Sequence, residues 1–146
     1  MPTHVRRQIR EAAASVLAAL STTGTRVSQS RMRPRADAAL PALLIETNEE
    51  SISPHSIGAQ LQRDLTLTVR GVAKATSDVD DTLDAIALEV ETALAAAPTL
   101  GGLSSQTALQ RITVDFDDST DKPVGVIALD YQVTYFTNAG SPGSIL

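Results

Sequence analysis

The strongest constraint on the fold is the alternation of apolar and polar side chains over Val124 to Thr137. Successive side chains of an extended strand point to opposite faces, so one face of this segment is apolar and the other polar. The apolar positions are Ile127, Leu129, Tyr131, Val133 and Tyr135, and the polar or small ones are Ala128, Asp130, Gln132 and Thr134. The segment is therefore predicted to be a long strand with one buried face.

A second alternating segment precedes this strand. In Leu109 to Phe116, the side chains of Ile112, Val114 and Phe116 share one side. A short polar loop joins the two segments, which is typical of an antiparallel hairpin.

Three earlier segments also suit strands: Thr25 to Met32, Ala42 to Thr47 and Leu61 to Arg70. The polar stretch Asn48 to Gly58 is predicted to be a mobile loop. Gly71 is predicted to mark a bulge or bend near the end of its strand.

Two segments show helical spacing of apolar residues, Thr3 to Leu20 and Asp78 to Ala97. Ser77 is the predicted N-cap of the second helix, whose first turn is acidic. The order of elements predicts an α+β fold, with a mainly antiparallel or mixed sheet of four to five strands and two helices packed on one face. Residues 1–137 are predicted to form a single domain, and residues 138–146 a flexible tail.

The charges of the chain are segregated. Residues 1–35 contain seven Arg and one Glu, a net charge of +6, and residues 36–146 contain five Lys or Arg and sixteen Asp or Glu, a net charge of −11. A nucleic-acid-binding protein usually shows an overall basic balance or a dense basic face, which this chain lacks. Oppositely charged surfaces on one chain can instead attract each other between copies, head to tail.

Nothing in the sequence indicates catalysis, a cofactor or a metal site. There is no cysteine, and His4 and His55 belong to no triad or zinc pattern. The acidic run from Asp115 to Asp121 resembles a calcium loop, but Thr120 and Val126 replace the Gly and Glu that an EF-hand requires. We interpret it as a solvated turn. No apolar run is long enough to span a bilayer.

The order of these features resembles the tail terminator proteins of long-tailed bacteriophages, the lambda-like ones and their relatives in prophages and gene transfer agents. Five phrases from residues 3–137 carry the resemblance: "HVRRQIREAAASVLAAL", "SRMRPRADAALPALLIE", "LQRDLTLTVRGVAK", "SDVDDTLDAIALEVETALAA" and "LDYQVTYFT". It implies a non-enzymatic virion protein that forms a hexameric ring on the head-proximal end of the tail tube. There it would stop tube polymerisation and offer a joining surface to head-completion or neck proteins.

The resemblance also implies assembly in the host cytoplasm, and DNA passing through the lumen without specific binding. We expect the copies to meet through a basic and an acidic cluster. The basic cluster is Arg31, Arg33 and Arg35, and the acidic one is Asp115, Asp117, Asp118 and Asp121. Two alternatives stay open: another neck or tail-completion protein, and a small ligand-binding regulatory domain, which would need a concave pocket with convergent polar groups.

Overall fold

One five-stranded sheet forms the centre of the computed structural model, which describes residues 3–29, 40–118 and 123–146. The strand order is β1-β2-β3-β5-β4. The strands are β1 (Val27–Ser28), β2 (Ala42–Pro54), β3 (Gln60–Lys74), β4 (Gln106–Asp117) and β5 (Val124–Asn138). All neighbouring strands are antiparallel except β1, which runs parallel to β2.

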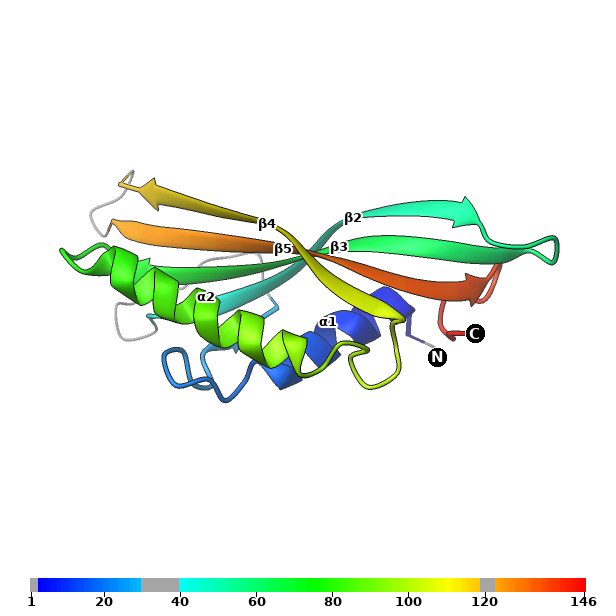
Figure 1. Cartoon of the computed structure of the whole chain (residues 1–146), viewed down its shortest axis with the longest axis horizontal. Coiled ribbons are helices and arrows are strands. Elements are labelled where there is room, and N and C mark those ends of the chain that lie inside the picture. Colours follow the sequence, from blue (N-terminus) through cyan, green and yellow to red (C-terminus); the bar gives the residue numbers. More distant parts are fainter. Residues whose placement is uncertain (1–2, 30–39, 119–122) are drawn as a thin grey trace.

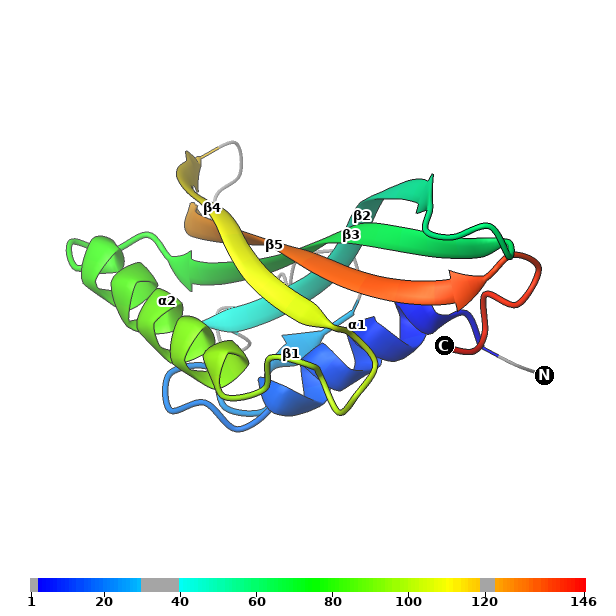
Figure 2. The same cartoon turned by 45° about the vertical axis from the view of Figure 1, so that its right-hand side comes forward.

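Both helices, α1 (Val5–Val16) and α2 (Val79–Ala95), lie on the same side of the sheet (Figure 1). The turned view shows α1 beneath the β1 and β2 side, while α2 lies beneath the strands near β4 (Figure 2). The fold class predicted from the sequence, α+β with two helices on one face of a mainly antiparallel sheet, is confirmed.

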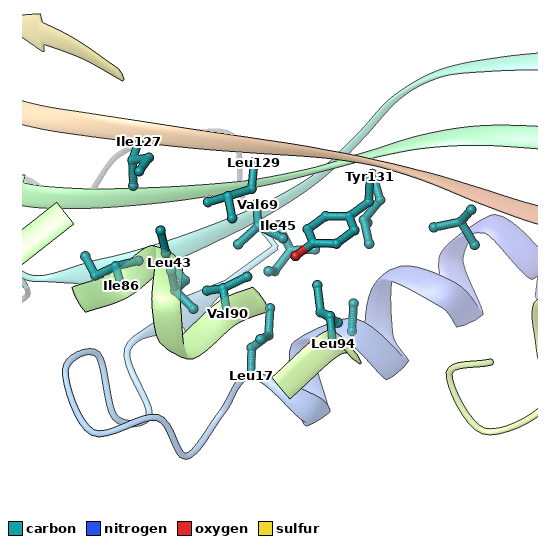
Figure 3. Packing of buried hydrophobic residues seen from close by; sticks show 14 of the residues in the cluster. Leu17, Leu43, Ile45, Val69, Ile86, Val90, Leu94, Ile127, Leu129 and Tyr131 are labelled. Carbon is teal, nitrogen blue, oxygen red and sulfur yellow. The ribbon is translucent and has the colours of Figure 1, made fainter. Parts of the chain in front are cut away.

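The core lies between the sheet and the two helices (Figure 3). The alternating apolar residues of β3 and β5 point into it, including Leu67, Val69 and Leu129, each 0% exposed. Ile86, Val90 and Leu94 from α2 meet them from below. Burial of aliphatic side chains stabilises the fold, because apolar surface leaves water at about 25 cal/mol per Å².

The predicted loop over residues 48–58 is wrong, because β2 continues to Pro54. Its polar half pairs with β3 through Pro54 opposite Leu61, after a register shift between Thr47 and Glu49. Backbone hydrogen bonds need no particular side chain, and polar side chains are tolerated on a strand that faces solvent. The turn that follows includes Ala59 at a positive φ of 65°.

Several predicted boundaries and roles also change. The first helix ends at Val16 and the second begins at Val79, with Asp78 at the N-cap position instead of Ser77. Gly71 makes no bulge, because it stays in regular register opposite Leu43 on one side and Ile127 on the other. A Cβ there would lie 2.7 Å from a methyl group of Ile86, so glycine allows α2 to approach β3 closely.

The C-terminal residues run back beside α1. The Val5 amide donates a hydrogen bond to the Pro142 carbonyl at 2.8 Å, and the Gln8 side chain donates one to the Gly143 carbonyl at 3.0 Å. The mobility of residues 138–146 and the single-domain organisation of residues 1–137 stay predictions. In the described part of the chain, neither helix has the length and apolarity that crossing a membrane requires.

Candidate assembly surface

The face of the sheet that carries no helix is polar and rich in carboxylates over its centre, while at one end Leu44, Val72 and Val124 form a small buried apolar cluster. Alternation places every second residue of β3 and β5 on this face. Its central members are Gln62, Asp64, Thr66, Thr68, Arg70, Asp130, Gln132 and Thr134. The alternation of the sequence predicted this polar side for β5, and the pairing of β3 with β5 combines the polar sides of the two strands into one surface.

Hydroxyl and amide groups hold the carboxylates of this surface in place. Thr68 donates to Asp130 at 2.7 Å and accepts a hydrogen bond from Asn48 at 3.2 Å. Thr134 donates to Asp64 at 2.8 Å. Neutral groups satisfy these two carboxylates in part, and within residues 3–29, 40–118 and 123–146 neither forms an ion pair.

A hollow of about 510 Å³ lies at one end of this face. Its lining combines apolar and charged residues: Leu44, Glu46, Arg70, Val72, Asp115, Phe116, Asp117, Asp118 and Val126. The Arg70 Nε donates to Glu46 at 2.8 Å across the floor. The hollow therefore has an acidic rim supplied by the end of β4.

The structure brings three members of the predicted acidic cluster together. Asp115, Asp117 and Asp118 all line the hollow, and an Asp115 oxygen accepts a hydrogen bond from the Phe116 amide at 2.9 Å. Asp121 lies outside the described residues, and so does the predicted basic cluster of Arg31, Arg33 and Arg35. The meeting of the two clusters stays a prediction.

Strand β4 carries an apolar strip that no element of the described chain covers. The strip consists of Leu109, Ile112, Val114 and Phe116, which are 37%, 42%, 47% and 52% exposed. The register with β5 places them on the helix-facing side of the sheet. The sequence predicted that three of them share a side, but the absence of a covering helix depends on where α2 lies.

A buried ionic cluster lies between the start of α1 and the sheet. It was not predicted from the sequence. The Glu50 carboxylate accepts from Arg63 at 3.0 Å and from Arg6 at 3.3 Å, and it also accepts from the Tyr135 hydroxyl. Arg63 also donates to Thr137 at 2.9 Å. Burial, followed by the hydrogen bond to Glu50, raises the pKa of the Tyr135 hydroxyl. Arg63 alternates in step with Leu61 and Leu65, so the sequence places a charged residue on the core face of its strand. That position could have indicated a buried ion pair.

Both histidines have local structural partners. The His4 ring nitrogen Nδ1 accepts from the Arg6 amide at 3.0 Å at the start of α1. Burial, and then the Arg6 charge, lowers the pKa of His4. The His55 ring lies against Phe136, with 4.5 Å between ring centroids. Within the described ranges, no group of three His, Asp or Glu residues is arranged to hold a metal ion.

The comparisons with known proteins give likenesses among solved structures alone. No protein-family model matches this chain, and the search of curated proteins found no match. Among solved structures, the chain is similar to one from the virion of a native gene transfer agent (GTA) particle. The two are 21% identical, with a TM-score of 0.48, over 90% of this chain and 92% of that chain.

Proposed function

We propose that this chain is a virion structural protein of a long-tailed phage or gene transfer agent, and within that class a tail terminator. Copies of it form a ring, a hexamer in the family that the sequence resembles, on the head-proximal end of the tail tube. The ring stops tube polymerisation and gives the head-completion or neck protein its joining surface. It assembles in the host cytoplasm and is retained in the virion.

The observation that carries this proposal is the uncovered, carboxylate-rich face of the sheet. In a ring with this face inward, Asp64 and Asp130 lie in the lumen, held by Thr134 and Thr68. Fixed negative charge repels DNA phosphates, so DNA passes without binding. The sequence resemblance over residues 3–137 supports the same role.

The placement of the acidic cluster supports a head-to-tail contact. Asp115 lies level with Val126, Val72 and then Ala42 across the sheet. The acidic end of β4 therefore lies at the same end of the sheet as the start of β2, beside which β1 forms the opposite edge. In the chain, the basic segment lies between β1 and β2. A neighbouring copy in the same orientation then faces the acidic cluster with its basic segment.

Reversing two of the basic charges tests this contact. We expect Arg31→Glu with Arg33→Glu to yield a folded monomer that neither forms rings nor caps tubes, because like charges then face each other. The free energy of unfolding should change by only about a few tenths of a kcal/mol. Thermal unfolding, light scattering and a tube-growth assay measure the three properties.

A matched control reverses charges away from both edges. Asp80 and Asp84 are exposed on α2, so Asp80→Lys with Asp84→Lys should leave rings intact. Normal rings from the arginine variant would contradict the contact, and the acidic end of β4 would then become the next surface to test. A wild-type protein that is strictly monomeric and does not bind tail tubes would contradict the tail terminator role itself.

Ionic strength gives an independent test of the same contact. Exposed charge pairs are screened as the Debye length falls to about 8 Å at physiological salt and lower beyond it. We expect ring assembly, followed by light scattering, to weaken as salt rises from tens to hundreds of millimolar. Assembly that strengthens with salt would indicate an apolar contact instead.

One observation favours a second candidate, a small ligand-binding domain. The hollow beside Asp115 and Arg70 combines apolar walls with charged groups, as ligand sites do. A monomer that binds an organic cation there, and shows no affinity for tubes, would support this candidate over the tail terminator. Another neck protein would form rings but fail to stop tube growth.

A further inference from the structure

We infer that copies of this chain join edge to edge into one continuous sheet, with β4 of one copy antiparallel to the outer edge of β2 in the next. This inference rests on the proposed ring and names the surface that builds it. The partner is a second copy of this chain, and the two surfaces are different parts of the same sheet. Such a contact repeats from copy to copy until the ring closes.

The first surface is the free edge of β4. The strand is 12 residues long and, among the described residues, pairs only with β5. Long edge strands invite pairing with another chain, so proteins shorten or cover them, or place Lys or Pro on them. Strand β4 contains neither Lys nor Pro, although Arg111, Asp115, Asp117 and a bulge between Leu109 and Arg111 protect parts of its edge. Its apolar strip is 37% to 52% exposed, and this strip is the surface that a neighbour would cover.

The second surface is the outer edge of β2. Strand β1 pairs only with Leu43 and Leu44, so in the described chain the rest of this edge carries no strand. From Asn48 to Pro54, every residue except Glu50 is exposed. Over Glu49 to Ser53, polar side chains keep the edge soluble before assembly, and the backbone groups that point away from β3 can pair with a neighbouring strand.

The directions of the strands fit this pairing. Strand β2 is antiparallel to β3, β3 to β5, and β5 to β4. Three reversals make β4 antiparallel to β2, so a second copy in the same orientation presents an antiparallel partner. All copies can therefore keep the same orientation around the ring and still pair β4 with β2 in the antiparallel direction.

The helix layer fits as well. Within one copy both helices lie on the lower side of the sheet, and β4 crosses in front of β5 above them (Figure 2). A neighbour whose β2 adjoins β4 brings its own α1 beneath the apolar strip of Ile112 and Val114. The surface that no helix covers in one copy is thereby covered by the next.

Charge complementarity points to the same neighbour. Arg111 on β4 and Glu49 on β2 are both exposed, and neither forms an ion pair with any residue that the structure describes. Both belong to the helix-free face by their registers with Asp130 and Thr66. Within one copy both residues line a single hollow of about 430 Å³. Joining the edges with Arg111 opposite Glu49 would instead place the guanidinium of one copy beside the carboxylate of the next.

Engineered cysteines test the pairing directly, because the chain has none of its own. We expect Arg111→Cys with Glu49→Cys, oxidised after assembly, to give a ladder of disulfide-linked oligomers up to the ring size. Within one copy, β2 and β4 are three strand spacings apart, about 14 Å. A disulfide needs Cα atoms within about 7 Å, so it can form only between copies.

The single-cysteine variants and a displaced pair are the controls. Each single variant should give dimers at most. Glu49→Cys with Asp84→Cys, which places the second thiol on the exposed side of α2, should give no ladder. A ladder from the displaced pair equal to that from the edge pair would overturn the inference, because it would reflect random collision.

A second variant separates this inference from the ring itself. Ile112→Lys should weaken assembly at least about tenfold, equivalent to 1.4 kcal/mol, while circular dichroism stays native. Leu88→Lys, at a 68% exposed position of α2, should assemble normally. Intact rings from Ile112→Lys, together with no ladder from the edge pair, would overturn the continuous sheet and leave the ring role standing. A wild-type protein without rings or tube binding would overturn both.

Discussion

Strands β4 and β5 are hydrogen-bonded neighbours with the same alternating pattern, yet they differ sharply in burial. Ile112 on β4 is directly opposite Leu129 on β5 and faces the same side of the sheet. Leu129 is 0% exposed and Ile112 is 42% exposed. The pattern of one strand thus indicates which face is apolar, while its place in the sheet decides whether that face is covered.

The position of α2 causes this difference. The helix approaches β5 closely at Gly125, where a Cβ would lie 2.7 Å from a methyl group of Val79 and 3.3 Å from Leu83. It also lies against Gly71 of β3 through Ile86. Because both glycines lack a side chain, α2 packs closely against β3 and β5 at the centre of the sheet. The apolar strip of β4, at the edge of the sheet, is therefore not covered by α2. The excess apolar surface there is more consistent with assembly than with folding.

The largest expected effect is on the buried side of this comparison. Leu129→Ala should lower the free energy of unfolding by about 3 kcal/mol, because the core loses buried methyl groups and gains a cavity. Chemical denaturation monitored by circular dichroism measures it. A loss below about 1 kcal/mol would mean that the core relaxes around the site, and would weaken the contrast with β4.

The matched substitution on the exposed strand should have a smaller effect on the free energy of unfolding and a larger effect on assembly. Ile112→Ala should cost about 1 kcal/mol or less, because much of the side chain already contacts water. Ring formation should fall, since the strip loses apolar area at the proposed contact. Denaturation and light scattering on the same samples separate the two. A loss of stability equal to that of Leu129→Ala would contradict the comparison.

The smallest expected effect concerns the next opposed pair, Tyr131 on β5 and Leu109 on β4. The Tyr131 hydroxyl is buried and finds no hydrogen-bond partner in the described structure. Tyr131→Phe removes an unsatisfied polar group, so stability at pH 7 should stay equal or rise by up to about 1 kcal/mol. A clear loss of stability would show that the hydroxyl has a partner, such as a bound water.

The same variant has a pH signature. Burial, and then the Glu91 charge, raises the pKa of Tyr131 from 10.0 to about 12. A raised pKa in the folded state means that the folded protein retains this proton longer than the unfolded chain. Stability is therefore full below pH 10 and falls as the pH rises toward 12. Tyr131→Phe should lose less stability across this range, with Tyr135 responsible for part of the remaining loss.

The sequence predicted helices and strands correctly where apolar residues recur at a regular spacing. It failed for the half of a strand whose residues are nearly all polar. The alternation of β5 and the helical spacing of α2 both led to correct elements. The half of β2 from Asn48 to Pro54 shows no such pattern, because its side chains face solvent or join the Glu50 cluster. Its strand is set by backbone pairing with β3, which depends on a partner distant in sequence.

The sequence by itself determined the α+β class, the apolar sides of β4 and β5 and the separation of basic from acidic charge. These follow from local spacing and composition, since a side chain's direction depends only on its own backbone. Only the tertiary structure decided which apolar strip stays uncovered, and that Asp115, Asp117 and Asp118 gather at one hollow. The first outcome depends on where α2 lies, and the second depends on the strand order that brings β2, β3 and β5 beside the end of β4. Both arise from contacts between residues far apart in the chain.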